Sequence, residues 1–175
     1  MAAMRCPACK STLSAVQYEG ITVEICGMCS GCWLDADELG RIVRIREQRF
    51  SPEQLSSIDT AVKIPGIPIQ DIQRDIACPS CGTPTGPLNY GGDTGIVVDR
   101  CPDCRGIWLD VGELESIQIL VELWKDSLPD DLRTYGPVLD RVDEELRNGN
   151  RVAVSGLPLV AGFINAIISG ILDVA

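Results

Sequence analysis

Histidine is absent from the 175 residues, and its absence removes several kinds of chemistry. Without an imidazole the chain cannot build a Ser-His-Asp triad, activate a cysteine through a histidine or form a mixed Cys/His metal site. Any metal must be held by thiolates and carboxylates. Aromatic residues are scarce too, with three Trp, three Tyr and two Phe. Small modules with so little core material usually need a disulfide or a metal.

Basic residues are also fewer than acidic ones. The chain has 15 Lys and Arg against 25 Asp and Glu, a net charge of -10, which disfavours general nucleic-acid binding. No apolar segment of a signal peptide follows the first residues. We therefore expect a cytoplasmic protein, in which thiols stay reduced and the nine cysteines serve metal binding rather than disulfides.

The cysteines fall into two groups that share one pattern: C-x2-C, a spacer of 16 or 19 residues, then C-x2-C. The first group is Cys6, Cys9, Cys26 and Cys29, followed by Cys32, and the second is Cys78, Cys81, Cys101 and Cys104. Four thiolates on two tight turns can surround one tetrahedral Zn²⁺. A redox dithiol is the alternative, but that motif occurs singly at a helix start. The doubled pattern therefore predicts two structural zinc ions.

The repeat extends beyond the cysteines. Residues 31–35 match residues 106–110, and Glu38-Leu39 matches Glu113-Leu114. Each spacer predicts a hairpin, with strands over 13–18 and 21–25 in the first copy and a return strand over 96–98 in the second. The three-residue difference in spacer length is expected in the turn at 89–93.

The segment after the second cysteine pair, Trp-Leu-Asp-x-x-Glu-Leu, predicts a helix start in both copies. Asp35 and Asp110 suit N-cap positions, with Glu38 and Glu113 at N3 of a variant capping box. We expect the preceding tryptophan of each copy to fold back onto its own ribbon. A pair of catalytic carboxylates is the alternative interpretation, and the capping pattern explains the spacing better.

CPxC followed by CxxCxGxWLDxxEL resembles the transcription-factor-IIB-type zinc-ribbon family, over residues 6–46 and 78–120. The resemblance implies one zinc on Cys6, Cys9, Cys26 and Cys29 and another on Cys78, Cys81, Cys101 and Cys104. The family name suggests transcription, although ribbons of this shape also bind proteins. Cys32 departs from the repeat, since Ile107 stands at the matching position. It is either an alternative ligand or a small buried apolar residue.

Two longer helices are expected, over 36–50 and 111–128, and they are expected to pack on each other. The first carries the basic cluster of the chain, Arg41, Arg44, Arg46 and Arg49. These arginines are candidate nucleic-acid contacts, with a solvated surface as the favoured alternative. Ser51 and Pro52 indicate a further helix start. The apolar, proline-rich connector over 63–69 is expected to pack on another part of the protein.

The predicted fold is a small α+β protein: two tandem four-cysteine zinc ribbons, each followed by an α-helix, plus a helical C-terminal region. The predicted organisation is ribbon one with its helix at 1–50, a linker at 51–77, ribbon two with its helix at 78–128, short helices at 129–150 and an apolar helix at 151–175.

The C-terminal segment has no charged residue from 152 to 172. Small residues every four positions favour close helix contact. The candidate partner or assembly face is Gly162, Phe163, Ala166, Ile167, Gly170 and Ile171. With Pro158 interrupting the run, the helix is slightly short for a bilayer span. Packing on the protein's own core, self-assembly, a protein partner and membrane contact all stay open.

We expect the protein to act through its binding surfaces rather than through reactive groups. A zinc held by four cysteines has no open position for water, and no phosphate loop or activated nucleophile is present in the sequence, so we do not expect an enzyme. The leading hypothesis is a zinc-stabilised scaffold or adaptor that binds a protein partner or itself. The alternatives are a transcription-related nucleic-acid or polymerase-binding factor, a membrane-associated scaffold, and a thiol-based sensor using Cys32.

Overall fold

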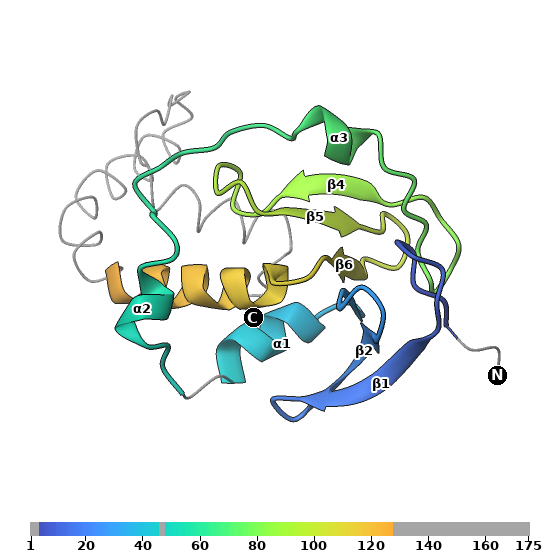
Figure 1. The fold of residues 1–175 in the computed structure, drawn as a ribbon, viewed down its shortest axis with the longest axis horizontal. Coiled ribbons are helices and arrows are strands. Elements are labelled where there is room, and N and C mark those ends of the chain that lie inside the picture. Colours follow the sequence, from blue (N-terminus) through green and yellow to red (C-terminus); the bar gives the residue numbers. More distant parts are fainter. Residues whose placement is uncertain (1–3, 46–47, 128–175) are drawn as a thin grey trace, which may run out of the picture.

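The computed structural model describes residues 4–45 and 48–127. Arg46 and the whole C-terminal face predicted for assembly lie outside these residues. The strands are β1 (Leu13–Tyr18), β2 (Ile21–Cys26), β3 (Cys32–Leu34), β4 (Gly86–Asn89), β5 (Val97–Arg100) and β6 (Ile107–Leu109). The helices are α1 (Glu38–Ile45), α2 (Pro52–Leu55), α3 (Ile69–Ile72) and a longer one over residues 113–127, drawn yellow to orange in Figure 1.

Both predicted hairpins are present. β1 and β2 pair antiparallel up to Tyr18 opposite Ile21, and the two turn residues, Glu19 and Gly20, have φ of 48° and 80°. Positive φ at both central residues matches the twist of a two-residue hairpin. The second hairpin, β4–β5, has the longer connection over 90–96, so the extra residues lie in the turn, as expected from the spacers.

The two ribbons form one sheet. β3 pairs antiparallel with β6, which joins both three-stranded halves in the order β1-β2-β3-β6-β5-β4. The register is nearly symmetric, since Trp33 lies opposite Trp108. Each half thereby covers the strand edge that the other half would leave exposed, and an exposed edge invites aggregation. The predicted α+β fold with two four-cysteine sites is confirmed, and the ribbons are joined rather than separate.

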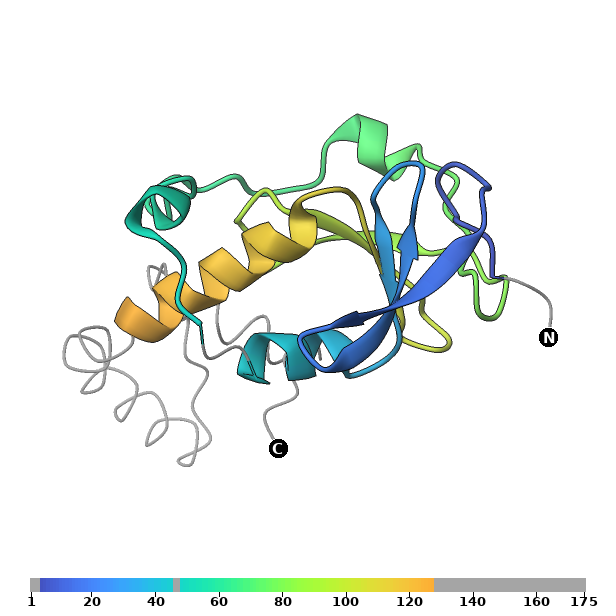
Figure 2. The ribbon, with the colours of Figure 1, turned by 60° about the horizontal axis from the view of Figure 1, so that its bottom comes forward.

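Alternation along β3 and β6 divides their side chains between two cores. Leu34 and Leu109 belong to the core formed with the helices, whereas Trp33 and Trp108 belong to the core that contains the zinc cysteines. α1 and the helix over 113–127 lie next to each other in both views (Figures 1 and 2). The Lys125 Nζ donates a hydrogen bond of 2.9 Å to the Val43 carbonyl. The expected pairing of the two helices is therefore confirmed.

The predicted capping box is half wrong. The two glutamate carboxylates do accept the expected backbone hydrogen bonds, Glu38 from the Asp35 N–H at 2.8 Å and Glu113 from the Asp110 N–H at 2.7 Å. The aspartate side chains, however, accept hydrogen bonds from the indole N–H groups of Trp33 and Trp108, at 3.1 and 3.0 Å. The indoles lie two residues away and fully buried, so each competes successfully for its carboxylate.

The helices begin later than the sequence suggested. Asp37 and Gly112 have φ of 73° and 83°, outside the helical region, and their carbonyls accept the first i+4 hydrogen bonds, from Arg41 and Ser116. α1 therefore starts at Glu38 rather than at residue 36. Glu38 and Glu113 are thus the first residues of their helices rather than N3, and each still accepts the backbone N–H of its aspartate.

The connector agrees with expectation at its start and differs further on. Ser51 caps α2 with a complete capping box, in which Ser51 and Gln54 bond reciprocally. Further along, the Asn89 amide holds the Ile64 and Gly66 carbonyls at 2.8 and 2.7 Å. The side chains of Ile64 and Ile69 are nevertheless 51% and 65% exposed. Within the described residues, Ile64 still packs on Gly95, since a Cβ added there would lie 2.9 Å from the Ile64 Cδ1. The expected packing of the connector is therefore found at Ile64, whereas Ile69 is largely exposed.

Candidate metal centres

Four nearly identical turns present the cysteine pairs. In each turn the carbonyl of the first cysteine accepts the N–H of the residue four positions on, at 2.8–3.1 Å. That residue has positive φ in every case: Lys10, Ser30, Gly82 and Arg105. The N–H of the first cysteine donates to the carbonyl of the residue five positions on, at 2.7–2.9 Å. Three of the four left-handed residues carry side chains, a strained choice that the turn imposes.

The turns bring eight sulfurs into two groups of four. The groups are Cys6, Cys9, Cys26 and Cys29, and Cys78, Cys81, Cys101 and Cys104. Within each group the sulfurs lie within 4.8 Å of one another, and the closest pairs are 3.4–3.6 Å apart. A tetrahedron with Zn–S of ~2.3 Å requires sulfurs about 3.8 Å apart, whereas a disulfide requires ~2.05 Å. All nine cysteines are free.

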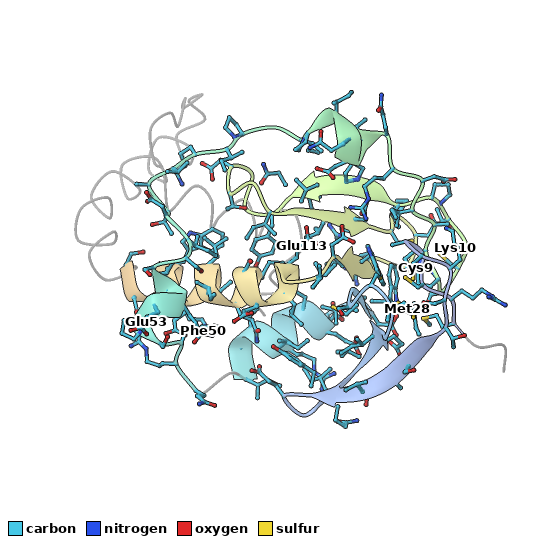
Figure 3. The ribbon with its side chains drawn as sticks, viewed as in Figure 1. Cys9, Lys10, Met28, Phe50, Glu53 and Glu113 are labelled. Atoms are coloured by element: carbon cyan, nitrogen blue, oxygen red, sulfur yellow. The ribbon has the colours of Figure 1, made fainter. Side chains whose placement is uncertain are left out.

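The donor set therefore fits two structural Zn²⁺ ions, as predicted. Four thiolates complete a tetrahedral sphere and exclude a water ligand. Backbone N–H groups point at the sulfurs, for example Cys9 at Cys6 and Cys81 at Cys78, both at 3.4 Å. Such N–H···S bonds stabilise the thiolate form that a metal needs. Figure 3 shows Cys9 and Met28 at one end of the molecule, opposite Phe50 and Glu53.

Hydroxyl side chains contact cysteine sulfurs in both sites, which was not predicted from the sequence. Ser11 Oγ lies 3.0 Å from the sulfurs of both Cys9 and Cys26, and Thr83 Oγ1 lies 3.4 Å from the sulfur of Cys81. The contact with Ser11 is the main cause that lowers the pKa of Cys26 to about 5. Thr83 is the main cause that lowers the pKa of Cys81 to about 6. Ser11 and Thr83 both stand five residues after the first cysteine of their copy, so the repeat itself carried the signal.

Cys32 lies apart from both groups. Its side chain is 6% exposed and packs in the helix-side core with Leu34 and Ile42. Burial, with a smaller contribution from the charge of Glu113, raises the pKa of Cys32 to about 12. A protonated thiol on the opposite side of the sheet from the zinc cysteines behaves as a small apolar residue.

The two tryptophans connect the metal centres across the repeat. A Cβ placed on Gly106 would lie 2.2 Å from Cζ2 of Trp33, and one on Gly31 would lie 2.4 Å from Cζ2 of Trp108. Each tryptophan therefore packs on the glycine of the other ribbon, not only on its own ribbon as expected from the sequence. Both rings are fully buried in one cluster with cysteines of both sites.

A charged cluster in ribbon two was not foreseen. The Arg74 guanidinium lies 2.6 and 3.1 Å from the two oxygens of Asp110 and 3.5 Å from Asp99. The side chain of Asp99 is 5% exposed. Burial raises the pKa of Asp99, and Arg74 opposes this rise. The acids at the matching positions of ribbon one are Glu24 and Asp35.

The predicted basic surface is only partly available. Arg41 and Arg44 are exposed on α1, and Arg49 forms ion pairs with Glu122 and Asp126. These acids lie on the helix over 113–127, so Arg49 connects the end of ribbon one to the second helix. An arginine engaged in this way contributes little to a phosphate-binding surface.

These features define a protein with two closed zinc ribbons in tandem. The family described as transcription factor zinc-finger, of the TFIIB zinc-ribbon type, matches residues 5–45 and 77–118. The chain thus carries two TFIIB-type zinc ribbons in tandem, as the sequence resemblance predicted, over a little under half of its residues. No curated protein and no solved structure matches the chain significantly. Within residues 4–45 and 48–127, no helix has the length and apolarity needed to cross a bilayer.

Proposed function

We propose that the protein is a zinc-stabilised adaptor that binds another protein through the surface of its joined ribbons. The observation that carries this proposal is the connector between the ribbons. It exposes four large aliphatic side chains by 51–65%: Val62, Ile64, Ile69 and Ile72. Ile69 and Ile72 are three residues apart on α3, and exposed apolar side chains that lie together are typical of interaction surfaces.

The closed metal centres support the same proposal. Each zinc would be held by four thiolates with no position left for a substrate, so the metal serves the fold rather than a reaction. The joined sheet gives the exposed connector a rigid support through Asn89, which lies at the end of β4. A rigid support lowers the entropy lost on binding a partner.

The proposal is tested by co-purification with tagged full-length protein. The variant Ile69→Ser/Ile72→Ser removes two exposed apolar side chains, so it should keep two zinc ions per chain and lose the specific partner. Val111→Ser is the matched control, because Val111 is 68% exposed but lies after β6. A partner set that is identical in both variants contradicts the connector as the binding surface.

A salt titration separates the nucleic-acid alternative from this proposal. Binding to DNA or RNA that weakens steeply with salt, and weakens further in Arg44→Glu, would favour a nucleic-acid factor. We expect no such binding, because the net charge is -10 and Arg49 is paired with acids.

A further inference from the structure

Arg74, just before ribbon two, is surrounded by the carboxylates of Asp110, Asp99 and Asp71, at 2.6, 3.5 and 3.9 Å. Asp99 lies opposite Trp108 in the pairing of β5 with β6, and Asp110 accepts the Trp108 indole N–H. Arg74 binds both oxygens of Asp110 and lies 3.5 Å from Asp99. Bidentate pairing of this kind selects a guanidinium group over an ammonium group.

Ribbon one has the same constellation of acids at the same positions. Glu24 lies opposite Trp33 in the pairing of β2 with β3, as Asp99 lies opposite Trp108. Asp35 accepts the Trp33 indole N–H, and Glu38 accepts the Asp35 N–H, each as in the other ribbon. Three independent contacts therefore establish the equivalence of the two sites.

Ribbon one has no arginine at the position equivalent to Arg74. Arg74 stands four residues before Cys78, whereas Ala2 stands four residues before Cys6. In the described part of the chain, no ion pair joins a basic group to Glu24 or Asp35. The side chain of Asp35 is exposed, and those of Glu24 and Glu38 are partly buried.

We propose that Glu24, Asp35 and Glu38 form a docking site for an arginine side chain of a protein partner, equivalent to the site that Arg74 fills in ribbon two. The proposal rests on the adaptor function and adds the chemistry of the partner: a segment with an exposed arginine. The overall charge of -10 favours a basic segment of this kind. Arginine is chosen over a metal ion because the equivalent acids hold a guanidinium group.

The test uses the zinc-loaded full-length protein labelled with ¹⁵N, and N-acetyl-arginine amide as the probe. The indole N–H signal of Trp33 reports on Asp35, and the signal of Trp108 in the same spectrum is the internal control. We expect the Trp33 signal to move saturably, with half-saturation on the order of 10 mM, while the Trp108 signal stays in place. N-acetyl-lysine amide at equal ionic strength should cause less than half of that movement.

Two variants make the result specific. Glu24→Gln should abolish the Trp33 response, whereas Glu53→Gln, at an exposed acid on α2, should leave it unchanged. A Trp33 signal that does not move overturns the proposal. This holds also if the reason is that a basic group of the same chain already occupies the site. Equal movement of both indoles, or an unchanged response in Glu24→Gln, overturns it too. Loss of the partner in Ile69→Ser/Ile72→Ser is measured separately, so failure of the docking site leaves the adaptor proposal intact.

Discussion

The two ribbons repeat the features that hold metal and differ in the features that surround it. The four cysteine turns, the tryptophan–aspartate hydrogen bonds and the reciprocal tryptophan–glycine contacts occur in both copies. The loop over 90–96, with its stacked pair of Tyr90 on Trp124, occurs in ribbon two alone among the described residues, and Arg74 of the linker binds Asp110 of that ribbon. The comparison suggests that zinc binding and the joining of the halves constrain the repeat, while the outer surfaces vary.

The differences have a common physical consequence. Ribbon two is tied to the connector and to the longer helix, through Asn89, Tyr90 and Arg74. Ribbon one contacts that same helix at the tip of its hairpin, where the Tyr18 hydroxyl donates to Gln118 at 2.7 Å. The helix over 113–127 thus contacts both halves of the molecule.

Removing a zinc ligand should have the largest effect on this comparison. A structural zinc contributes on the order of 10 kcal/mol, as much as the total stability of many domains. Because β3 pairs with β6, we expect Cys26→Ala and Cys101→Ala each to disorder both ribbons, seen as a collapse of NMR signal dispersion and less than two zinc ions per chain by elemental analysis.

Cys32→Ala is the matched control for the ligand variants. It should keep two zinc ions and lose only about 1 kcal/mol through a small cavity in the core. If Cys26→Ala leaves the signals of ribbon two in place, the halves fold independently despite their common sheet.

The next largest loss of stability is expected from substituting the two glycines where the ribbons meet. Gly106→Ala and Gly31→Ala each force a methyl group into the tryptophan of the other ribbon. We expect a loss of about 2–3 kcal/mol for each, the upper part of the range for overpacked cores, measured by urea unfolding. Gly86→Ala is the control, since a Cβ there meets nothing within 4 Å. Equal stability of all three variants would contradict the close contact between ribbons.

Arg74→Gln should show a difference in stability between the acids of the two ribbons. The substitution leaves the buried Asp99 without its cation, and we expect a loss of about 2 kcal/mol at pH 7.5, below the range for fully buried pairs because Arg74 is 25% exposed. The double variant Arg74→Gln/Asp99→Asn should recover part of this loss. Glu24→Gln in ribbon one should not destabilise the protein, because none of the residues that the structure describes forms an ion pair with Glu24. A loss in Glu24→Gln equal to that in Arg74→Gln would contradict the asymmetry.

The smallest expected effect is a pH dependence from Glu113. Burial is the main cause that raises the pKa of Glu113 to about 7, above that of glutamate in the unfolded chain, so the folded state binds this proton more tightly. Stability from this group is therefore present at low pH and is lost as the pH rises through 7, by about 1 kcal/mol between pH 6 and 8. Urea unfolding at both pH values measures the change.

Glu113→Gln should remove this dependence and keep the hydrogen bond to Asp110. Glu38→Gln should change the pH dependence less, because Glu38 is less buried than Glu113, although burial raises its pKa in the same direction. An unchanged slope in Glu113→Gln would show that another group titrates.

Much of the local structure was predictable from spacing. The positions of eight cysteines, the length of the hairpin turns and the cap at Ser51 each depend on residues a few positions apart, and local geometry decides them. The indole contacts of Asp35 and Asp110 were not predicted, because a capping pattern and a tryptophan two residues earlier compete for one carboxylate. The exposure of Ile69 was not predicted either, because hydropathy gives no account of the Asn89 amide, which holds the connector through the carbonyls of Ile64 and Gly66.

The sequence by itself determined the two metal sites, since thiolates at fixed intervals on tight turns leave one chemistry available. Only the tertiary structure decided that the ribbons form one sheet, why a glycine precedes each tryptophan by two positions, and which set of acids receives an arginine. The reason is that these features depend on contacts between residues about 75 positions apart, such as Trp33 with Gly106, and such distances in sequence carry no local signal.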